Sequence, residues 1–400
     1  MTLLTLQEIE QAREIIAPVI RDTRATYANS LSRRLTTDLW LKPEYLQRTG
    51  SFKFRGAYSR CSQLTPGSHV VAGSAGNHAQ GVALAASMLG HRATIFMPLG
   101  ASLPKVQATR AYGAEVILGG RTVDECIELA KERTIGGAAT LVPPFDHPAI
   151  LAGQGTIGLE LCEQVPDLRT VLVAIGGGGL CAGIAAAIKQ VRPEVRVIGV
   201  MAAGAASMRA SAEAGSPVAV DPATIADGIA LRSPTPLTLE HIQKFVDELV
   251  VVTDEEITQA MLLLLERAKA VVEPAGAAPL AALCSGAVSL SGGAAAVVLG
   301  GGNVDPLLLG KLVDHGLGAM GRYLRVRIVA PDRPGSLAAI TEALAELQLN
   351  VIEVEHQRFG VKLALNTVAI GVVIETTDHE HQEQVLATLR ARGFDVESER

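Results

Sequence analysis

Short apolar runs alternate with longer Ala-rich stretches through residues 1–320, and several of the runs end directly in Gly or Ser. A short apolar run bounded by turn residues is typical of a buried strand, and the longer stretches between the runs favour helices. The predicted strands are 39–41, 70–72, 93–97, 115–118, 171–175, 195–200 and 295–299. The predicted helices are 77–89, 103–112, 123–132, 179–190 and 254–271. Repeated strand–turn–helix units indicate a parallel α/β architecture, in which ligands bind at the carboxyl ends of the strands.

The pattern changes near residue 322. Residues 323–329 alternate apolar and charged side chains, which is typical of a strand with one face in water. The elements predicted after it are a helix (337–347), two strands (352–357 and 367–375), a helix (380–391) and a last strand (394–397). This βαββαβ order predicts a small ferredoxin-like domain, and the Gly-rich segment 316–321 is the predicted joint before it.

Composition narrows the choice of class. A chain of 400 residues exceeds what one hydrophobic core usually organises, so two or three domains are expected. The net charge of -6, without a Lys/Arg tract, argues against nucleic acid and anionic membrane surfaces as partners. No apolar stretch is long enough to span a bilayer, and the five scattered cysteines form no C-x-x-C pair, so a reducing, cytoplasmic location is expected.

Lys53 is the first candidate for chemistry. It has a phenylalanine on each side, so its amine can lie in a partly dry place. Burial disfavours the ammonium form, and a second cation nearby, such as Arg55, would act in the same direction. A lone lysine is usually a solvated surface charge, but a lysine in this setting can form a Schiff base with an aldehyde.

A run of four glycines is the second candidate. Gly176, Gly177, Gly178 and Gly179 link an apolar strand to a helix that starts near Leu180. The start of a helix presents unpaired N–H groups and a positive dipole end, which suit a phosphate. A tight turn is the alternative. The run has neither the G-x-G-x-x-G spacing nor the Lys-Ser/Thr of a P-loop.

The loop 74–81 is the third candidate, because it follows a strand and opens a helix. The hydroxyl of Ser74, the side chain of Asn77 and the free N–H groups could hold a substrate carboxylate, although Ser74 could also be a simple helix N-cap. A reactive amine, a phosphate-binding turn and a polar loop together indicate an enzyme that uses pyridoxal 5'-phosphate (PLP).

The same segments carry a family resemblance. The stretch 42–57, which contains Thr49-Gly50-Ser51-Phe52-Lys53-x-Arg55-Gly56-Ala57, closely resembles the signature of PLP-dependent threonine/serine dehydratases of fold type II. Residues 74–81 resemble their substrate loop. Further matching segments follow in the family's order, at 145–148, 152–156, 176–180, 227–228 and 273–277. The resemblance covers residues 1 to about 320, and residues 322–400 resemble an ACT domain, the amino-acid-sensing module often joined to such enzymes.

The resemblance implies roles for individual residues. Lys53 would hold the PLP aldehyde, Gly176 to Leu180 would cradle the phosphate, and Asn77 would hydrogen-bond the ring hydroxyl. The residues implied around the substrate carboxylate are Ser74, Gly76, Asn77 and His78, and the segment of Glu273 is implied near the ring.

Two positions depart from the pattern of relatives. Gly300 stands where the family usually has a Ser or Cys that faces the pyridine nitrogen, so a side-chain donor is missing there. Ala75 stands where the related serine racemase has a proton-carrying serine, which favours elimination over racemisation. Some relatives bind a divalent cation through acidic residues after the strand that ends near residue 200. Because residues 201–207 read Met-Ala-Ala-Gly-Ala-Ala-Ser, no such metal site is predicted.

The implied organisation is a large PLP-binding domain (1–65 and 144–320), a small catalytic subdomain (66–143) and an ACT regulatory domain (322–400). The implied reaction is the β-elimination of L-threonine to 2-oxobutanoate and ammonia, as in isoleucine biosynthesis. An amino-acid effector is expected near the loop 332–336 and Asn350, and the chain is expected to form a homodimer or homotetramer.

Three alternatives stay open from the residues alone. An L-serine dehydratase or related hydroxyamino-acid lyase differs by recognition of one methyl group, which is worth only ~1–3 kcal/mol. A dinucleotide-binding oxidoreductase would need a spaced Gly fingerprint with an acidic residue about 20 positions later. A non-catalytic amino-acid sensor would have no use for Lys53 and the glycine run.

Overall fold

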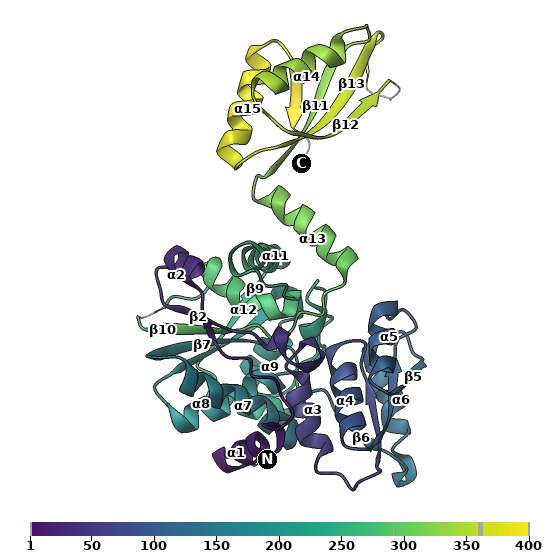
Figure 1. Cartoon of the computed structure of the whole chain (residues 1–400), viewed down its shortest axis with the longest axis vertical. Helices are drawn as coiled ribbons and strands as arrows, with labels where there is room; N and C mark the ends of the chain where they lie inside the picture. Colours follow the sequence, from purple (N-terminus) through teal and green to yellow (C-terminus); the bar gives the residue numbers. More distant parts are fainter. Residues whose placement is uncertain (1, 291, 359–362, 399–400) are drawn as a thin grey trace. The chain divides into compact units, whose positions relative to one another are not determined.

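Apolar side chains gather on three β-sheets. Two sheets lie in residues 1–306 and one in residues 307–400, and these are the two units into which the chain divides. The computed structural model describes the chain except residues 1, 291, 359–362 and 399–400 (Figure 1). Within the described residues, no helix is both long enough and apolar enough to cross a membrane.

The larger sheet has the strand order β1-β2-β10-β7-β8-β9. Neighbouring strands are parallel, except that β1 runs antiparallel to β2. Its strands are β1 (Thr26–Tyr27), β2 (Leu39–Lys42), β7 (Leu168–Ala174), β8 (Arg196–Ala202), β9 (Glu248–Val252) and β10 (Ala294–Val298). The central strands β7, β8 and β10 are buried almost throughout, as expected for a parallel sheet that is covered on both faces.

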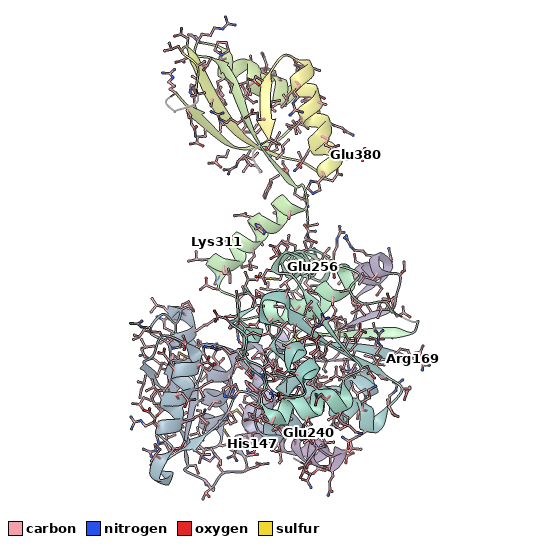
Figure 2. All side chains as sticks on the ribbon, turned by 180° about the vertical axis from the view of Figure 1, so that it is seen from behind. His147, Arg169, Glu240, Glu256, Lys311 and Glu380 are labelled. Atoms are coloured by element: carbon pink, nitrogen blue, oxygen red, sulfur yellow. The ribbon has the colours of Figure 1, made fainter. Side chains whose placement is uncertain are left out.

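Helices cover both faces of this sheet, with α7 and α8 on one face and α11 and α12 on the other (Figure 1). The helices of this layer are α1 (Leu6–Ile16), α2 (Asn29–Leu35), α3 (Lys53–Cys61), α7 (Pro148–Gln164), α8 (Gly179–Val191), α9 (Ser207–Ala214), α10 (Pro236–Phe245), α11 (Asp254–Leu263) and α12 (Pro274–Cys284). His147, labelled in Figure 2, caps the start of α7, where its Nδ1 accepts a hydrogen bond of 3.1 Å from the N–H of Ala149.

The smaller sheet is built from one continuous stretch of chain. Its order is β5-β4-β3-β6, and every pair is parallel. The strands are β3 (His69–Gly73), β4 (Arg92–Met97), β5 (Glu115–Leu118) and β6 (Thr140–Leu141), and the helices are α4 (Asn77–Met88), α5 (Leu103–Ala111) and α6 (Val123–Glu132). The parallel α/β architecture predicted from the apolar runs is therefore confirmed for both sheets.

The second unit contains an antiparallel sheet of order β12-β13-β11-β14. Its elements are α13 (Pro306–Ala319), β11 (Tyr323–Pro331), α14 (Ser336–Glu346), β12 (Val351–Gln357), β13 (Thr367–Glu375), α15 (His379–Ala391) and β14 (Asp395–Ser398). On β11 the side chains of Leu324, Val326 and Ile328 are buried, while Arg325 between them is exposed. The alternation and the βαββαβ order confirm the predicted ferredoxin-like domain.

Two predicted elements are wrong in detail. The helix predicted over 254–271 ends early: α11 stops at Leu263, continues as one π-helical turn over Leu264–Ala268, and the chain leaves it at Lys269 with φ of +56°. The glycine-rich joint predicted at 316–321 lies mostly inside α13. Glycine weakens a helix by only about 1 kcal/mol per residue, which the neighbouring apolar residues can offset.

Candidate active site

A cavity of about 190 Å³ lies where the carboxyl ends of strands from both sheets meet. The loops that follow β3, β7 and β10 all reach its wall, as expected for ligand sites in parallel sheets. Every site residue predicted from the sequence lines it, namely Lys53, Ser74, Gly76, Asn77, His78, Gly176, Gly177, Gly178, Gly179, Leu180 and Gly300. Segments almost 250 residues apart in the chain thus form one site.

Lys53 is the first residue of α3 and is half-buried. Its Nζ donates a hydrogen bond of 2.9 Å to the carbonyl of Pro144 and lies 5.2 Å from the centre of the Phe52 ring. Burial lowers the pKa of this amine to about 8, and the carboxylate of Glu273 opposes part of that shift. A substantial fraction of the amine is therefore neutral, and nucleophilic, near neutral pH.

The expected influence of Arg55 on this amine is wrong. Arg55 is fully buried and forms ion pairs with Glu44 at 2.8 Å and Glu160 at 2.5 Å, while Lys42 pairs with the same Glu160 at 2.5 Å. Residues two apart on a helix point in different directions, so Arg55 faces α7 instead of the cavity. Its guanidinium is part of a buried ion-pair network that links α3, the helix that begins at Lys53, to α7.

The glycine run closes tightly around other parts of the protein. Gly178 is the N-cap of α8 and has a φ of +92°, which L side chains rarely adopt. A Cβ on Gly177 or Gly179 would collide with Phe145, and one on the first glycine would lie 2.8 Å from the Cα of Ile229. The run therefore reflects close packing as well as an exposed helix start, which the sequence alone could not separate.

The polar loop after β3 opens α4 through a glycine. Gly76 is the N-cap, and the hydroxyl of Ser74 accepts a hydrogen bond of 3.2 Å from its N–H, so the alternative that Ser74 caps the helix is wrong. His78 is buried, and its Nε2 donates to the carbonyl of Val142 at 2.8 Å. Burial and the charge of Lys53 lower the pKa of His78 to about 3, so the imidazole is neutral.

Asn77 lies in a chain of side-chain hydrogen bonds. Its Nδ2 donates to Oε1 of Glu273 at 2.7 Å, and its Oδ1 accepts from Nδ2 of Asn303 at 2.8 Å. Glu273 is the N-cap residue of α12 and is almost completely buried. Burial, together with the charge of Asp227, raises the pKa of Glu273 to about 7.

Sequence reasoning missed two features of the wall. Lys105 of α5 forms an ion pair of 2.8 Å with Asp227, so the edge of the cavity is bridged between the smaller and the larger sheet. Lys105 comes soon after the carboxyl end of β4. Because ligand sites lie at the carboxyl ends of parallel strands, this position could have marked Lys105 as a site residue. Asn303 contacts the site through Asn77. It stands three residues after Gly300, in a segment that resembles the family's last signature, but no role was predicted for it.

The residues present fit a phosphorylated aldehyde such as PLP. The amine of Lys53 and the glycine-lined start of α8 share one cavity, so an aldehyde and a phosphate could be held in it together. A Cβ at Gly300 would lie 3.3 Å from the Phe52 ring, so a small side chain could be accommodated there with a slight shift, but this chain offers only backbone.

Comparison with known proteins agrees with this fit. Residues 16–301 match the family model described as pyridoxal-phosphate dependent enzyme. The chain belongs to this family. Residues 324–394 match the model of the ACT domain. The protein is thus a fold type II PLP enzyme with a C-terminal ACT domain, as the sequence motifs implied.

The chain is similar to individual proteins and solved structures over most of its length. The chain is 42% identical over 398 residues to an L-threonine ammonia-lyase of Thermotoga maritima, covering 98% of this chain and 99% of that protein. A second L-threonine ammonia-lyase, from Geobacter sulfurreducens, is 42% identical over 97% of this chain and 98% of its own. Among solved structures, the processed form of threonine deaminase isoform 2 from Solanum lycopersicum is similar with a TM-score of 0.72 and 35% identity, over 77% of this chain and 93% of that one. Maize serine racemase is similar with a TM-score of 0.73 and 32% identity, over 80% and 99%.

Proposed function

We propose that this chain is a PLP-dependent threonine ammonia-lyase that converts L-threonine to 2-oxobutanoate and ammonia by β-elimination. The observation that carries the proposal is the amine of Lys53, with a pKa of about 8, in one cavity with the glycine-lined start of α8. The names of the two relatives that match nearly the whole chain support threonine as the substrate.

Three groups would hold the cofactor. Lys53 would anchor its aldehyde, the backbone N–H groups of residues 176–180 would bind its phosphate, and Asn77 would hydrogen-bond its ring hydroxyl; all of these residues line the cavity. When bound, PLP supplies an electron sink for negative charge that develops at the substrate Cα. Gly300 contributes no side-chain donor to the pyridine nitrogen, so the tuning of the ring is left to backbone groups or water.

The remaining residues act on the amino acid. Ser74, Gly76 and His78 surround the substrate carboxylate, which the Ser74 hydroxyl and the backbone N–H groups of the loop would hold. The single ring N–H of the neutral His78 donates to the carbonyl of Val142. Lys53 Nζ, which lies in the same cavity, would accept the proton from the substrate Cα. A lysine pKa near the operating pH suits this task, because the neutral base is then abundant and its conjugate acid can still return a proton.

Ala75 favours elimination over racemisation. Ala75 lines the cavity and carries no group that could deliver a proton to the opposite face of the substrate. The chain is similar in fold to maize serine racemase, but the second proton carrier would be absent at this position. An L-serine dehydratase or related hydroxyamino-acid lyase is the second candidate function, since one methyl group decides between threonine and serine.

Two experiments test the proposal. Borohydride reduction of the holoenzyme, followed by peptide mapping, should place the label on Lys53. The Lys53→Ala variant should lose the release of 2-oxobutanoate from threonine, while Lys131→Ala, an exposed lysine of α6, should retain it. A label on another residue, or turnover by Lys53→Ala at the wild-type rate, would show that Lys53 is not the anchor and base. Kinetics with threonine and serine side by side decide between the two candidate functions.

We also propose that the ACT domain binds an amino acid and regulates the enzyme. Gly335, with a φ of +96°, lies in the loop 332–336 and caps α14. Asn350, which directly precedes β12, donates to Glu375 at the end of β13. A branched-chain effector would bind near these residues, in a cytoplasmic homodimer or homotetramer. Isoleucine and valine should change the threonine kinetics of the full chain, and deletion of 322–400 should abolish that change. A deletion variant whose kinetics equal those of the full chain, with and without isoleucine or valine, would contradict the proposal.

The proposed domain division is a large domain (1–65 and 144–320), a small subdomain (66–143) and the ACT domain (322–400). The smaller sheet supports it, because β3 to β6 all lie within 66–143. Limited proteolysis of the holoenzyme would test the division by the positions of the first cuts.

A further inference from the structure

The direction of the hydrogen-bond chain around Asn77 is fixed from one end. Asn303 Nδ2 donates to the backbone carbonyl of Thr49 at 2.6 Å, and a carbonyl can only accept. The same nitrogen donates to Oδ1 of Asn77, so the Nδ2 of Asn77 must point the other way, toward Glu273. The orientation of the Asn77 amide therefore follows from Asn303 and holds whether Glu273 is ionised or protonated.

The carbonyl that fixes this direction belongs to an unusual turn. Thr49 has a φ of +62° and Gly50 a φ of +72°, and a β-branched residue rarely adopts the left-handed region. The amide of Asn303 fits beneath the turn because Gly50 has no Cβ, which would collide with it. The turn ends only three residues before Lys53. Asn303 thus contacts both the turn that precedes Lys53 and the side chain of Asn77.

We propose that Asn303 is a positioning residue, whose single amide nitrogen orients the Asn77 side chain and holds the left-handed turn that precedes Lys53. The inference rests on the proposed function, in which Asn77 and Lys53 hold the cofactor. Asn303 comes from the loop after β10, whereas Asn77 and Lys53 start α4 and α3. One donor group therefore sets the relative placement of three segments around the cavity.

Two variants of the full-length holoenzyme separate this role from packing. Asn303→Ala removes the donor, and Asn303→Asp keeps the volume but places acceptor oxygens against the Thr49 carbonyl and Asn77 Oδ1. Each should weaken PLP binding, measured by equilibrium dialysis, and lower kcat for threonine by about tenfold or more, because small displacements of reacting groups are costly. Val304→Ala, a half-buried neighbour in the same loop, is the control and should stay within about twofold of the wild type.

The relative severity of Asn303→Asp and Asn303→Ala distinguishes a positioning role from a space-filling role. A space-filling role predicts that Asn303→Asp is milder than Asn303→Ala, whereas the positioning role predicts that it is at least as severe. Asn303→Asp also retains the side-chain volume, so it remains informative if Asn303→Ala is too unstable to purify. A mild Asn303→Asp variant would overturn the inference.

A double-mutant cycle tests whether Asn303 acts through Asn77. In the Asn77→Ala background, Asn303→Ala should lower PLP affinity less than it does in the wild type, because only its bond to the turn before Lys53 is then left to lose. Fully additive effects would overturn the inference. If the wild-type enzyme released no ammonia from threonine or serine, the proposed function would fail, and the PLP-affinity measurements would still decide the role of Asn303.

Discussion

The lowered pKa of Lys53 predicts how the apoenzyme takes up its cofactor. An amine with a pKa of about 8 is neutral in roughly one molecule in ten at pH 7, against about one in 3,000 for an ordinary lysine. The reactive form is thus ~300-fold more abundant than on a solvated lysine. The rate of PLP attachment should therefore rise with pH only to a plateau near pH 9, because an amine with a pKa of about 8 is already about nine-tenths neutral at that pH.

Glu273→Gln is the matched perturbation, because it removes a carboxylate that raises the pKa of Lys53 but keeps an acceptor for Asn77. The midpoint of the rate profile should move to lower pH. Because the pKa of Glu273 is itself about 7, this carboxyl is charged only above that pH, so the two profiles should differ above pH 7 and converge below about pH 6.

Stopped-flow absorbance of the visible cofactor band measures these rates. PLP with N-acetyl-lysine amide at the same pH values is the reference, because the rate of this ordinary amine should still climb through pH 10. A wild-type rate that keeps climbing about tenfold per pH unit through pH 10 would show that Lys53 is an ordinary, solvated amine. Identical profiles for wild type and Glu273→Gln would show that the carboxylate does not act on it.

Three further predictions follow from packing and buried charge. Gly177→Ala should lower PLP affinity and destabilise the chain by about 1–3 kcal/mol, because the new Cβ collides with the Phe145 ring; thermal unfolding and PLP titration measure both. Arg55→Leu should cost roughly 3–5 kcal/mol in urea unfolding, since it leaves buried carboxylates without their counter-charge. Gly300→Ser should keep the melting temperature within a few degrees, because its Cβ would lie 3.3 Å from the Phe52 ring, while the added hydroxyl should shift the absorbance of the bound cofactor.

The sequence was most informative where local chemistry decides structure. The strand at Glu115–Leu118 and the helix at Val123–Glu132 have the predicted bounds, because apolar spacing and flanking turn residues determine both. The strands β1 and β6 have two residues each and are too short to produce a pattern.

The candidate site was predicted in its main residues but not in its supporting contacts. Lys53 and the glycine run stand out because their residue types are unusual in such settings. The pairing of Arg55 with Glu160 and that of Asn303 with Asn77 each join residues more than a hundred positions apart, so no window of sequence contains them. The wrong expectation for Arg55 came from treating a neighbour in the chain as a neighbour in space.

The pairing of β2 with β10 has a consequence for synthesis on the ribosome. Trp40 lies opposite Ala296, so the parallel partner of β2 is made about 250 residues later. At about 5–20 residues per second, the nascent chain waits roughly 13–50 seconds for it. The smaller sheet needs no such wait, since its four strands are contiguous in the chain. During translation β2 therefore stays without this parallel partner long after the smaller sheet can have folded, so it is a segment that a chaperone could protect.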